Sequence, residues 1–265
     1  GSAMADWTMR LGRRETRPRA ARRAAPAVLP ALLALIVAGE AGAGLLERRR
    51  MLTAEEHAPW RAVGRVNIAS FDERGMCTGT LIAQDLVITA AHCVISGRTG
   101  AVYPPGNVTF VAGWRQGVAV AHSKAATIVI HPGYRRDAPV DLERIGSDLA
   151  LIRLRREIPA DLAPHFKVAP AAVARGALTM ISYRRDRAHA LTRQEGCDVE
   201  GARDAVLALG CDVTFGASGS PLFVEVGGET RLVAVVSAMS RGRTGPLAWA
   251  VRVEAVIGEV LARLD

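Results

Sequence analysis

Three features are missing from this 265-residue sequence, and each absence narrows the class of protein. No helical patterns of 10–15 residues alternate with its strand-like segments, which argues against a parallel α/β sheet. No internal repeat is present. The third missing feature is an apolar run long enough to span a membrane, which needs about 20 residues. The run from Ala24 to Ala38 has about 15 residues and contains Pro26 and Pro30. An uncleaved membrane anchor is therefore the weaker interpretation of this run.

The composition indicates a folded domain without a nucleic-acid partner. Hydrophobic residues make up 49% of the chain and charged residues 23%, an ordinary globular balance. The net charge of +8 would suit a polyanionic partner. However, subtracting the seven arginines and three acidic residues that precede Gly44 leaves only +4. A mildly basic remainder needs no polyanion to explain it, so we expect no binding to nucleic acid.

Residues 1–43 have the order of a secretory signal peptide: basic residues, then an apolar run, then Ala41-Gly42-Ala43. The first four residues resemble a remnant of an expression tag, unless the natural start is Met4 or Met9. We expect cleavage near Ala43 and a secreted or periplasmic protein. Contact with a membrane is expected only if this segment stays uncleaved.

Four cysteines in an exported chain favour disulfides over metal or redox chemistry. Of the three possible pairings, proximity in the sequence favours Cys77 with Cys93 and Cys197 with Cys211. Each bond would close a loop of about 15 residues, worth roughly 3 kcal/mol in the chain-entropy model. One reduced pair is the open alternative. We expect no metal and no cofactor.

Residues 44–59 are charged, and we interpret them as an exposed lead-in or a propeptide. The run Arg48-Arg49-Arg50 is either a propeptide cleavage site or a solvated linker.

From residue 60 to residue 265, short β-type segments separated by Gly, Pro and Asp predict one all-β sandwich or barrel domain. Such segments are Arg65–Ile68, Gly79–Ile82, Leu86–Thr89, Val108–Val111, Ala126–Ile130, Leu149–Ile152 and Leu232–Val236. Apolar residues at helical spacing predict one helix over Val253–Leu264.

A histidine follows one of these strands in the segment Val87-Ile88-Thr89-Ala90-Ala91-His92-Cys93. The small alanines leave room for the His92 imidazole to face a cleft, and a disulfide at Cys93 would fix its backbone. A general base must be placed to hydrogen-bond accuracy, so a rigid neighbour is useful. The alternative is a surface histidine at a strand end.

A carboxylate, Asp148, directly precedes the apolar strand Leu149–Leu154. In that place it can accept a hydrogen bond from a histidine ring and hold the required tautomer. By itself this signal is weak, because Asp before a strand is common turn chemistry.

The run Gly216-Ala217-Ser218-Gly219-Ser220-Pro221 allows a tight loop around a serine. Its glycines let backbone N–H groups point at one spot, so Gly216 and Ser218 are candidates for an oxyanion hole. Such a donor contributes roughly 2.7–4 kcal/mol to lowering the barrier.

These three segments resemble the signature blocks of the trypsin/chymotrypsin family, in that family's order His, Asp, Ser. The Cys77–Cys93 spacing and His131-Pro132-Gly133-Tyr134 also resemble the family, and the resemblance covers about residues 60–255. It implies two six-stranded antiparallel β-barrels with the site between them. It also implies a serine endopeptidase in which Ser218 is the nucleophile, His92 the base and Asp148 its orienting group.

Departures from the family pattern concern activation and specificity. Ala217 stands where animal members have the Asp that pairs with a new N-terminus, so the sequence resembles bacterial members, including the glutamyl-endopeptidase-like branch. Asp212 lies six residues before Ser218, where trypsin has the aspartate that binds basic side chains at P1, the residue before the scissile bond. Asp212 is equally a candidate for a structural group within the loop.

The expected substrate-binding edge is Ser237, Ala238 and Met239, to which a peptide would add by β-pairing. Val236 stands where the glutamyl-endopeptidase branch has histidine, which counts against acidic P1. We expect a monomeric enzyme with polypeptide substrates. The alternatives are a catalytically silent adaptor of the same fold and a disulfide-rich structural protein without serine reactivity.

Overall fold

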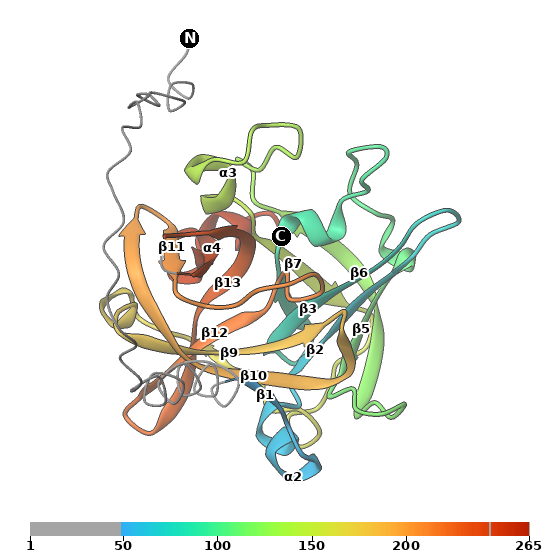
Figure 1. Cartoon of the computed structure of the whole chain (residues 1–265). Coiled ribbons are helices and arrows are strands. Elements are labelled where there is room, and N and C mark those ends of the chain that lie inside the picture. The colour runs from blue at the N-terminus through green and yellow to red at the C-terminus, as the bar shows by residue number, and fades with distance from the viewer. Residues whose placement is uncertain (1–48, 244, 265) are drawn as a thin grey trace, which may run out of the picture. The chain divides into compact units, whose positions relative to one another are not determined.

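The computed structural model describes residues 49–243 and 245–264, and two β-barrels make up most of them (Figure 1). The first barrel closes in the order β2-β3-β4-β7-β6-β5, with antiparallel neighbours throughout. Its strands are β2 (Val63–Ala69), β3 (Arg74–Ala83), β4 (Leu86–Thr89), β5 (Val108–Ala112), β6 (Ala121–Ile130) and β7 (Ala150–Leu154).

The second barrel follows in the chain and closes because β9 pairs with both β10 and β12. Its order is β9-β10-β11-β14-β13-β12. The strands are β9 (Ala177–Arg184), β10 (Arg187–Arg203), β11 (Val206–Leu209), β12 (Pro221–Val226), β13 (Glu229–Arg241) and β14 (Pro246–Arg252). The short strand β8 (Lys167–Val168) runs parallel to β13. The predicted architecture of two six-stranded antiparallel barrels is confirmed.

Helices are few and short in this part of the chain. The predicted C-terminal helix is α4 (Val253–Leu261), and its buried face consists of Val253, Val256 and Val260. The others are α2 (Ala54–His57), α3 (Leu142–Gly146), and the 3-10 turns η1 (Ala58–Trp60), η2 (Ala91–Val94), η3 (Pro105–Asn107) and η4 (Ala171–Val173).

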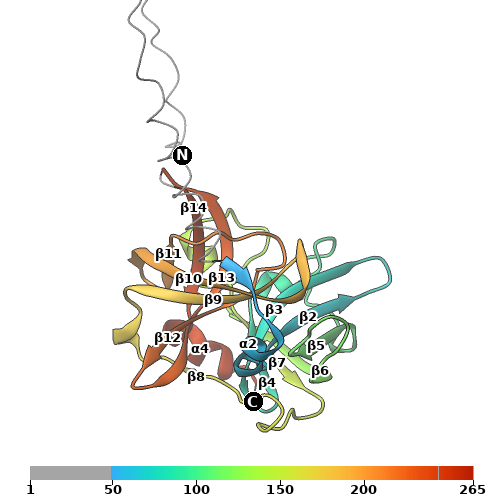
Figure 2. The ribbon, with the colours of Figure 1, turned by 60° about the horizontal axis from the view of Figure 1, so that its bottom comes forward.

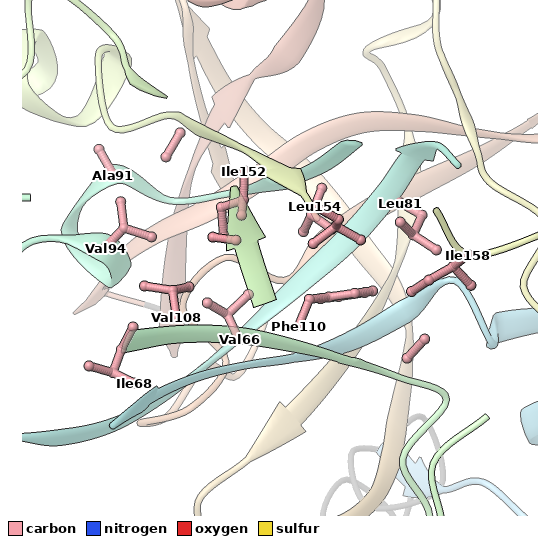
Figure 3. Close-up of a cluster of buried hydrophobic side chains, with 14 of the residues drawn as sticks. Val66, Ile68, Leu81, Ala91, Val94, Val108, Phe110, Ile152, Leu154 and Ile158 are labelled. Carbon is pink, nitrogen blue, oxygen red and sulfur yellow. The ribbon is translucent and has the colours of Figure 1, made fainter. Parts of the chain in front are cut away.

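Alternating burial along the strands builds the core of the first barrel. In β5, Val108, Phe110 and Ala112 point inward and are fully buried, as the two-residue period of a strand requires. Val66 and Leu81 from β2 and β3 meet them in the cluster drawn in Figure 3.

A second apolar cluster joins the two barrels. It combines Ile88 and Leu151 of the first barrel with Tyr183 and Val235 of the second. The rings of Trp60, Phe166 and Phe223 also pack there, with centroids 4.5 Å apart for the two phenylalanines. A third cluster fills the second barrel. Residues contributed by both barrels can therefore be held in fixed relation at the junction.

Residues 49–59, expected as an exposed lead-in, are built into the fold. The strand β1 (Arg49–Met51) pairs with β10 (Figure 2), and Leu52 is 2% exposed. Thr53 caps α2 and forms a reciprocal capping box with Glu56. Arg50 donates two hydrogen bonds of 2.6 Å to the same Glu56. These contacts give Arg49 and Arg50 a structural role that the composition of the segment alone does not reveal.

Both expected disulfides, Cys77–Cys93 and Cys197–Cys211, are present.

The predicted signal peptide, residues 1–43, lies outside the described residues. Within the described ranges, none of the helices has the length and apolar character needed to cross a membrane.

Candidate active site

His92 lies in the turn η2, directly after strand β4 ends. Ala90 and Ala91 beside it are fully buried, so the chain turns tightly against the core. The disulfide at Cys93 ties this turn to Cys77 in β3. The buried alanines before His92 and the disulfide after it therefore both fix the backbone of this residue.

Asp148 orients the His92 ring. It lies between α3 and β7 and is 3% exposed. His92 Nδ1 donates to its Oδ2 at 2.7 Å, and the His92 backbone N–H donates to its Oδ1 at 2.9 Å. A third donor is the Ser237 hydroxyl, at 2.5 Å from Oδ2. With Nδ1 protonated by this pairing, the neutral imidazole presents Nε2 as its basic nitrogen.

The Asp148 carboxylate is charged despite its burial. Removal from water raises its pKa, but the positive charge of His92 and the hydrogen bonds from His92 and Ser237 outweigh this effect, so the pKa lies below its ordinary value. A buried anion beside Nδ1 stabilises the imidazolium that forms when His92 accepts a proton.

The loop around Ser218 depends on two glycines with positive φ. Gly216 has φ +91°, and a Cβ there would lie 2.8 Å from the backbone nitrogen of Arg185. Gly219 has φ +78°, and a Cβ there would clash with Thr78 O and Thr89 Oγ1. In the described residues, the N–H groups of Gly216 and Ser218 have no hydrogen-bond acceptor. Both amides are thus free to bind an oxyanion.

Thr78 of the first barrel holds this loop. Its N–H donates to Ser218 O at 2.9 Å, and its hydroxyl donates to Gly216 O at 3.1 Å. The same hydroxyl accepts from the Tyr183 N–H at 2.9 Å. Ala217 between the glycines is fully buried. The nucleophile loop of one barrel is therefore bonded to a strand of the other.

His92 and Ser218, the candidate base and nucleophile, both lie where the barrels meet, but no hydrogen bond joins their side chains in the described residues. In the described part of the chain, Ser218 Oγ forms no hydrogen bond, and His92 Nε2 lies 3.8 Å from Cys93 Sγ. Catalytic hydrogen bonds commonly tighten only when substrate binds.

Asp212, a candidate for binding a basic P1 side chain, is already paired. Its carboxylate forms an ion pair with Arg49 of β1 and lies 3.8 Å from Nη1 of Arg184. Arg184 is 4% exposed and also pairs with Asp186 at 3.1 Å. Of the two roles that the sequence left open for Asp212, these contacts correspond to the structural one.

The expected substrate edge lies at the end of β13. On one side Ala238 pairs with Trp249 and Met239 with Ala248 of β14. On the other side, β12 pairs only as far as Val235. For residues 237–241, the described strands provide no partner on that side, and the Met239 side chain is 47% exposed.

Several contributing contacts were not predicted from the sequence. Thr78 follows Cys77 without any motif of its own, and the partners of its hydroxyl lie more than 100 positions away. The bond from Ser237 to Asp148 spans 89 positions. Arg49 was interpreted only as part of a basic run. No local pattern signals such contacts, because they depend on how the barrels meet.

Comparison with known proteins shows the family to which this chain belongs. Residues 52–257 match the Trypsin family. Among solved structures, a Glu endopeptidase aligns with a TM-score of 0.65 and 18% identity over 82% of this chain and 97% of its own. The protease Anisep from Arthrobacter nicotinovorans gives 0.63 and 18%, over 80% and 96%. The thermostable serine protease AL20 from an extremophilic microorganism gives 0.60 and 16%, over 78% and 98%.

At these identities the solved structures show a shared fold. The match to the family extends over most of the described residues, and it includes His92, Asp148 and the Ser218 loop. The chain belongs to the trypsin family and is a serine endopeptidase of bacterial type.

Proposed function

We propose that this enzyme is exported and cleaves polypeptides through an acyl-enzyme formed on Ser218. Ser218 Oγ attacks the scissile carbonyl while His92 Nε2 takes its proton, and the carbonyl electrons move to an oxyanion held by the N–H groups of Gly216 and Ser218. His92 then gives the proton to the departing amine. Water, activated by the same histidine, releases the acid and restores the serine.

The observation that carries this proposal is the set of three hydrogen bonds on the buried Asp148 carboxylate. They fix both the ring orientation and the tautomer of His92. A buried charge with three partners is costly to maintain in a protein without use for it. This observation favours an active enzyme over a silent adaptor of the same fold.

A fluorophosphonate probe tests the mechanism directly. The folded wild-type protein should be labelled at Ser218, and the Ser218→Ala variant should not be labelled. Ser220→Ala is a matched control, because Ser220 lies two residues away and is fully buried, and this variant should still be labelled. Absence of labelling in the folded wild type would support the adaptor instead.

For specificity, we propose an uncharged P1 side chain. A basic P1 residue would have to compete with Arg49 and Arg184 for the Asp212 carboxylate. An acidic P1 residue would be repelled by the Asp212 carboxylate. It would also lack the histidine that the glutamyl-endopeptidase branch has at the position of Val236. Peptides that differ only at P1 should be cleaved best when P1 is Ala, Val or Leu. Faster cleavage of Lys or Arg peptides would contradict this assignment.

Export and the monomeric state remain predictions. Two disulfides fit an oxidising compartment. N-terminal sequencing of the secreted product would locate cleavage near Ala43, and sedimentation analysis would measure the oligomeric state.

A further inference from the structure

A small cavity adjoins the catalytic pair. It has a volume of about 230 Å³ and is bounded on one side by His92, Ser237 and Ala238. Arg136, Arg144 and Ile145 line the other side, from the connection between β6 and β7. The cavity therefore opens between the catalytic histidine and the free edge of β13.

The position of this cavity assigns it to one residue of the substrate. A peptide that pairs with the edge at Ser237–Met239 has side chains that alternate between its two faces. In the proposed function, the P1 carbonyl lies at Ser218 and the P1 side chain is directed toward Asp212, away from His92. The preceding residue, P2, then points to the His92 side, where the cavity lies.

The cavity is positively charged. In the described residues, neither Arg136 nor Arg144 forms an ion pair with a carboxylate. The acid that lines the cavity is Asp148, and both of its oxygens already accept hydrogen bonds from His92 or Ser237. The two guanidinium charges are thus available to a ligand.

Arg144 is held in a fixed position. One of its terminal nitrogens, Nη1, donates to Ala138 O at 2.5 Å, and its guanidinium lies over the Tyr134 ring, 5.8 Å from the centroid. A planar group with several donors keeps further N–H groups for a carboxylate after one is used. Such preorganisation lowers the entropic cost of binding.

We propose that Arg136 and Arg144 make this enzyme select an acidic side chain, Glu or Asp, at P2. The inference rests on the proposed function, since it assigns a substrate class to the same site. It differs from P1 selection, because the residues involved come from the first barrel and do not contact Asp212. A lysine at P2 would be repelled by the same two charges.

Peptides with one fixed sequence and Glu, Gln or Lys at P2 test the proposal. The wild-type kcat/KM should be about fivefold higher for Glu than for Gln, the upper end expected of an exposed charge contact, and lowest for Lys. The Glu/Gln ratio should fall in 0.5 M salt, which screens such contacts. A ratio near one, or selection of acid at P4 instead of P2, would overturn the assignment.

Two variants locate the effect. Arg144→Gln and, separately, Arg136→Gln should each lower the Glu/Gln ratio several-fold, and the second variant leaves the Tyr134 contact in place. Arg156→Gln is the matched control, because Arg156 lines a different cavity with Thr109 and His122. Its ratio should equal that of the wild type. Unchanged ratios in both test variants would overturn the proposal even if the wild type prefers Glu.

Probe labelling separates this inference from the proposed function. If Ser218 is labelled and peptides are cleaved without P2 preference, only the acidic selection fails. If Ser218 is not labelled and no peptide is cleaved, the proposed function fails and the inference with it.

Discussion

In the proposed mechanism, the two barrels contribute different kinds of catalytic part. The first supplies side chains, His92 and Asp148, which polar contacts and a disulfide orient. The second supplies mainly backbone: two N–H groups and a serine in a loop whose conformation depends on Gly216 and Gly219. A base needs one tautomer and one ring direction, whereas an oxyanion hole needs N–H directions. The first requirement is met by hydrogen bonds and the second by φ angles that favour glycine.

The sharpest test of this division asks whether the parts act as one unit. Ser218→Ala, on the second barrel, and His92→Ala, on the first, should each reduce kcat by about 10⁶-fold, because each removes the nucleophilic attack. The double variant should be hardly worse than either single variant. Single-turnover hydrolysis of an activated ester measures all three.

Strictly additive losses would mean that the barrels contribute independently. Circular dichroism spectra that match the wild type would show that the variants are folded.

Asp148→Asn tests the polar orientation of the first barrel alone. The change keeps the shape of the side chain but removes the charge and allows the wrong tautomer of His92, so kcat should fall by about 10⁴-fold. KM should change little, because Asp148 is buried beneath His92. Steady-state kinetics on one peptide provide both constants. A loss of tenfold or less would contradict the orienting role.

Thr78→Val tests the connection between the barrels. The hydroxyl bonds to both Gly216 O and Tyr183 N–H, and its loss leaves buried groups unpaired at a cost of about 1–3 kcal/mol. We expect kcat to fall by about tenfold, since the oxyanion loop loses its support. Urea unfolding and steady-state kinetics measure the two effects.

The neighbouring Thr80 offers a close control. It is also fully buried, but its hydroxyl has no hydrogen-bond partner in the described residues. Thr80→Val should therefore be neutral or stabilising, with unchanged kcat. Equal effects at both positions would show that Thr78 acts only through packing.

The last expected effect is on stability alone and concerns His57, which lies in α2, before the first strand of either barrel. Burial lowers its pKa to about 4, with Arg115 adding to the shift, and the side chain is 4% exposed. The unfolded chain binds a proton near pH 6.5 and the folded one does not. Stability should therefore fall as the pH drops from about 6.5 towards 4, by roughly 2–3 kcal/mol.

His57→Leu should flatten this part of the pH profile, measured by urea unfolding. His122→Leu, at an exposed position, should not. The lowered pKa of Asp148 acts at lower pH, because its contribution is lost only as the pH falls through that pKa.

The same contrast explains what the sequence could predict. In the first barrel, β2 and β5 alternate in burial, and β4 was predicted with its observed bounds of Leu86–Thr89. The 17-residue β10 was not predicted, because charged residues follow its buried centre and hide the two-residue period. The family blocks are contiguous runs of residues and could be found. The pairing of Asp212 with Arg49 joins residues 163 positions apart, and no local pattern encodes it.

The Cys77–Cys93 bond has a consequence for where the enzyme works. Cys77 precedes Thr78, which holds the Ser218 loop, and Cys93 follows His92. One disulfide therefore supports the positions of both His92 and Ser218. Thiol reductants should thus slow turnover before the protein unfolds, which parallel assays of activity and tryptophan fluorescence would detect. If the chain is exported as proposed, this bond would form, and align the two residues, only after the enzyme has left the compartment in which it is made.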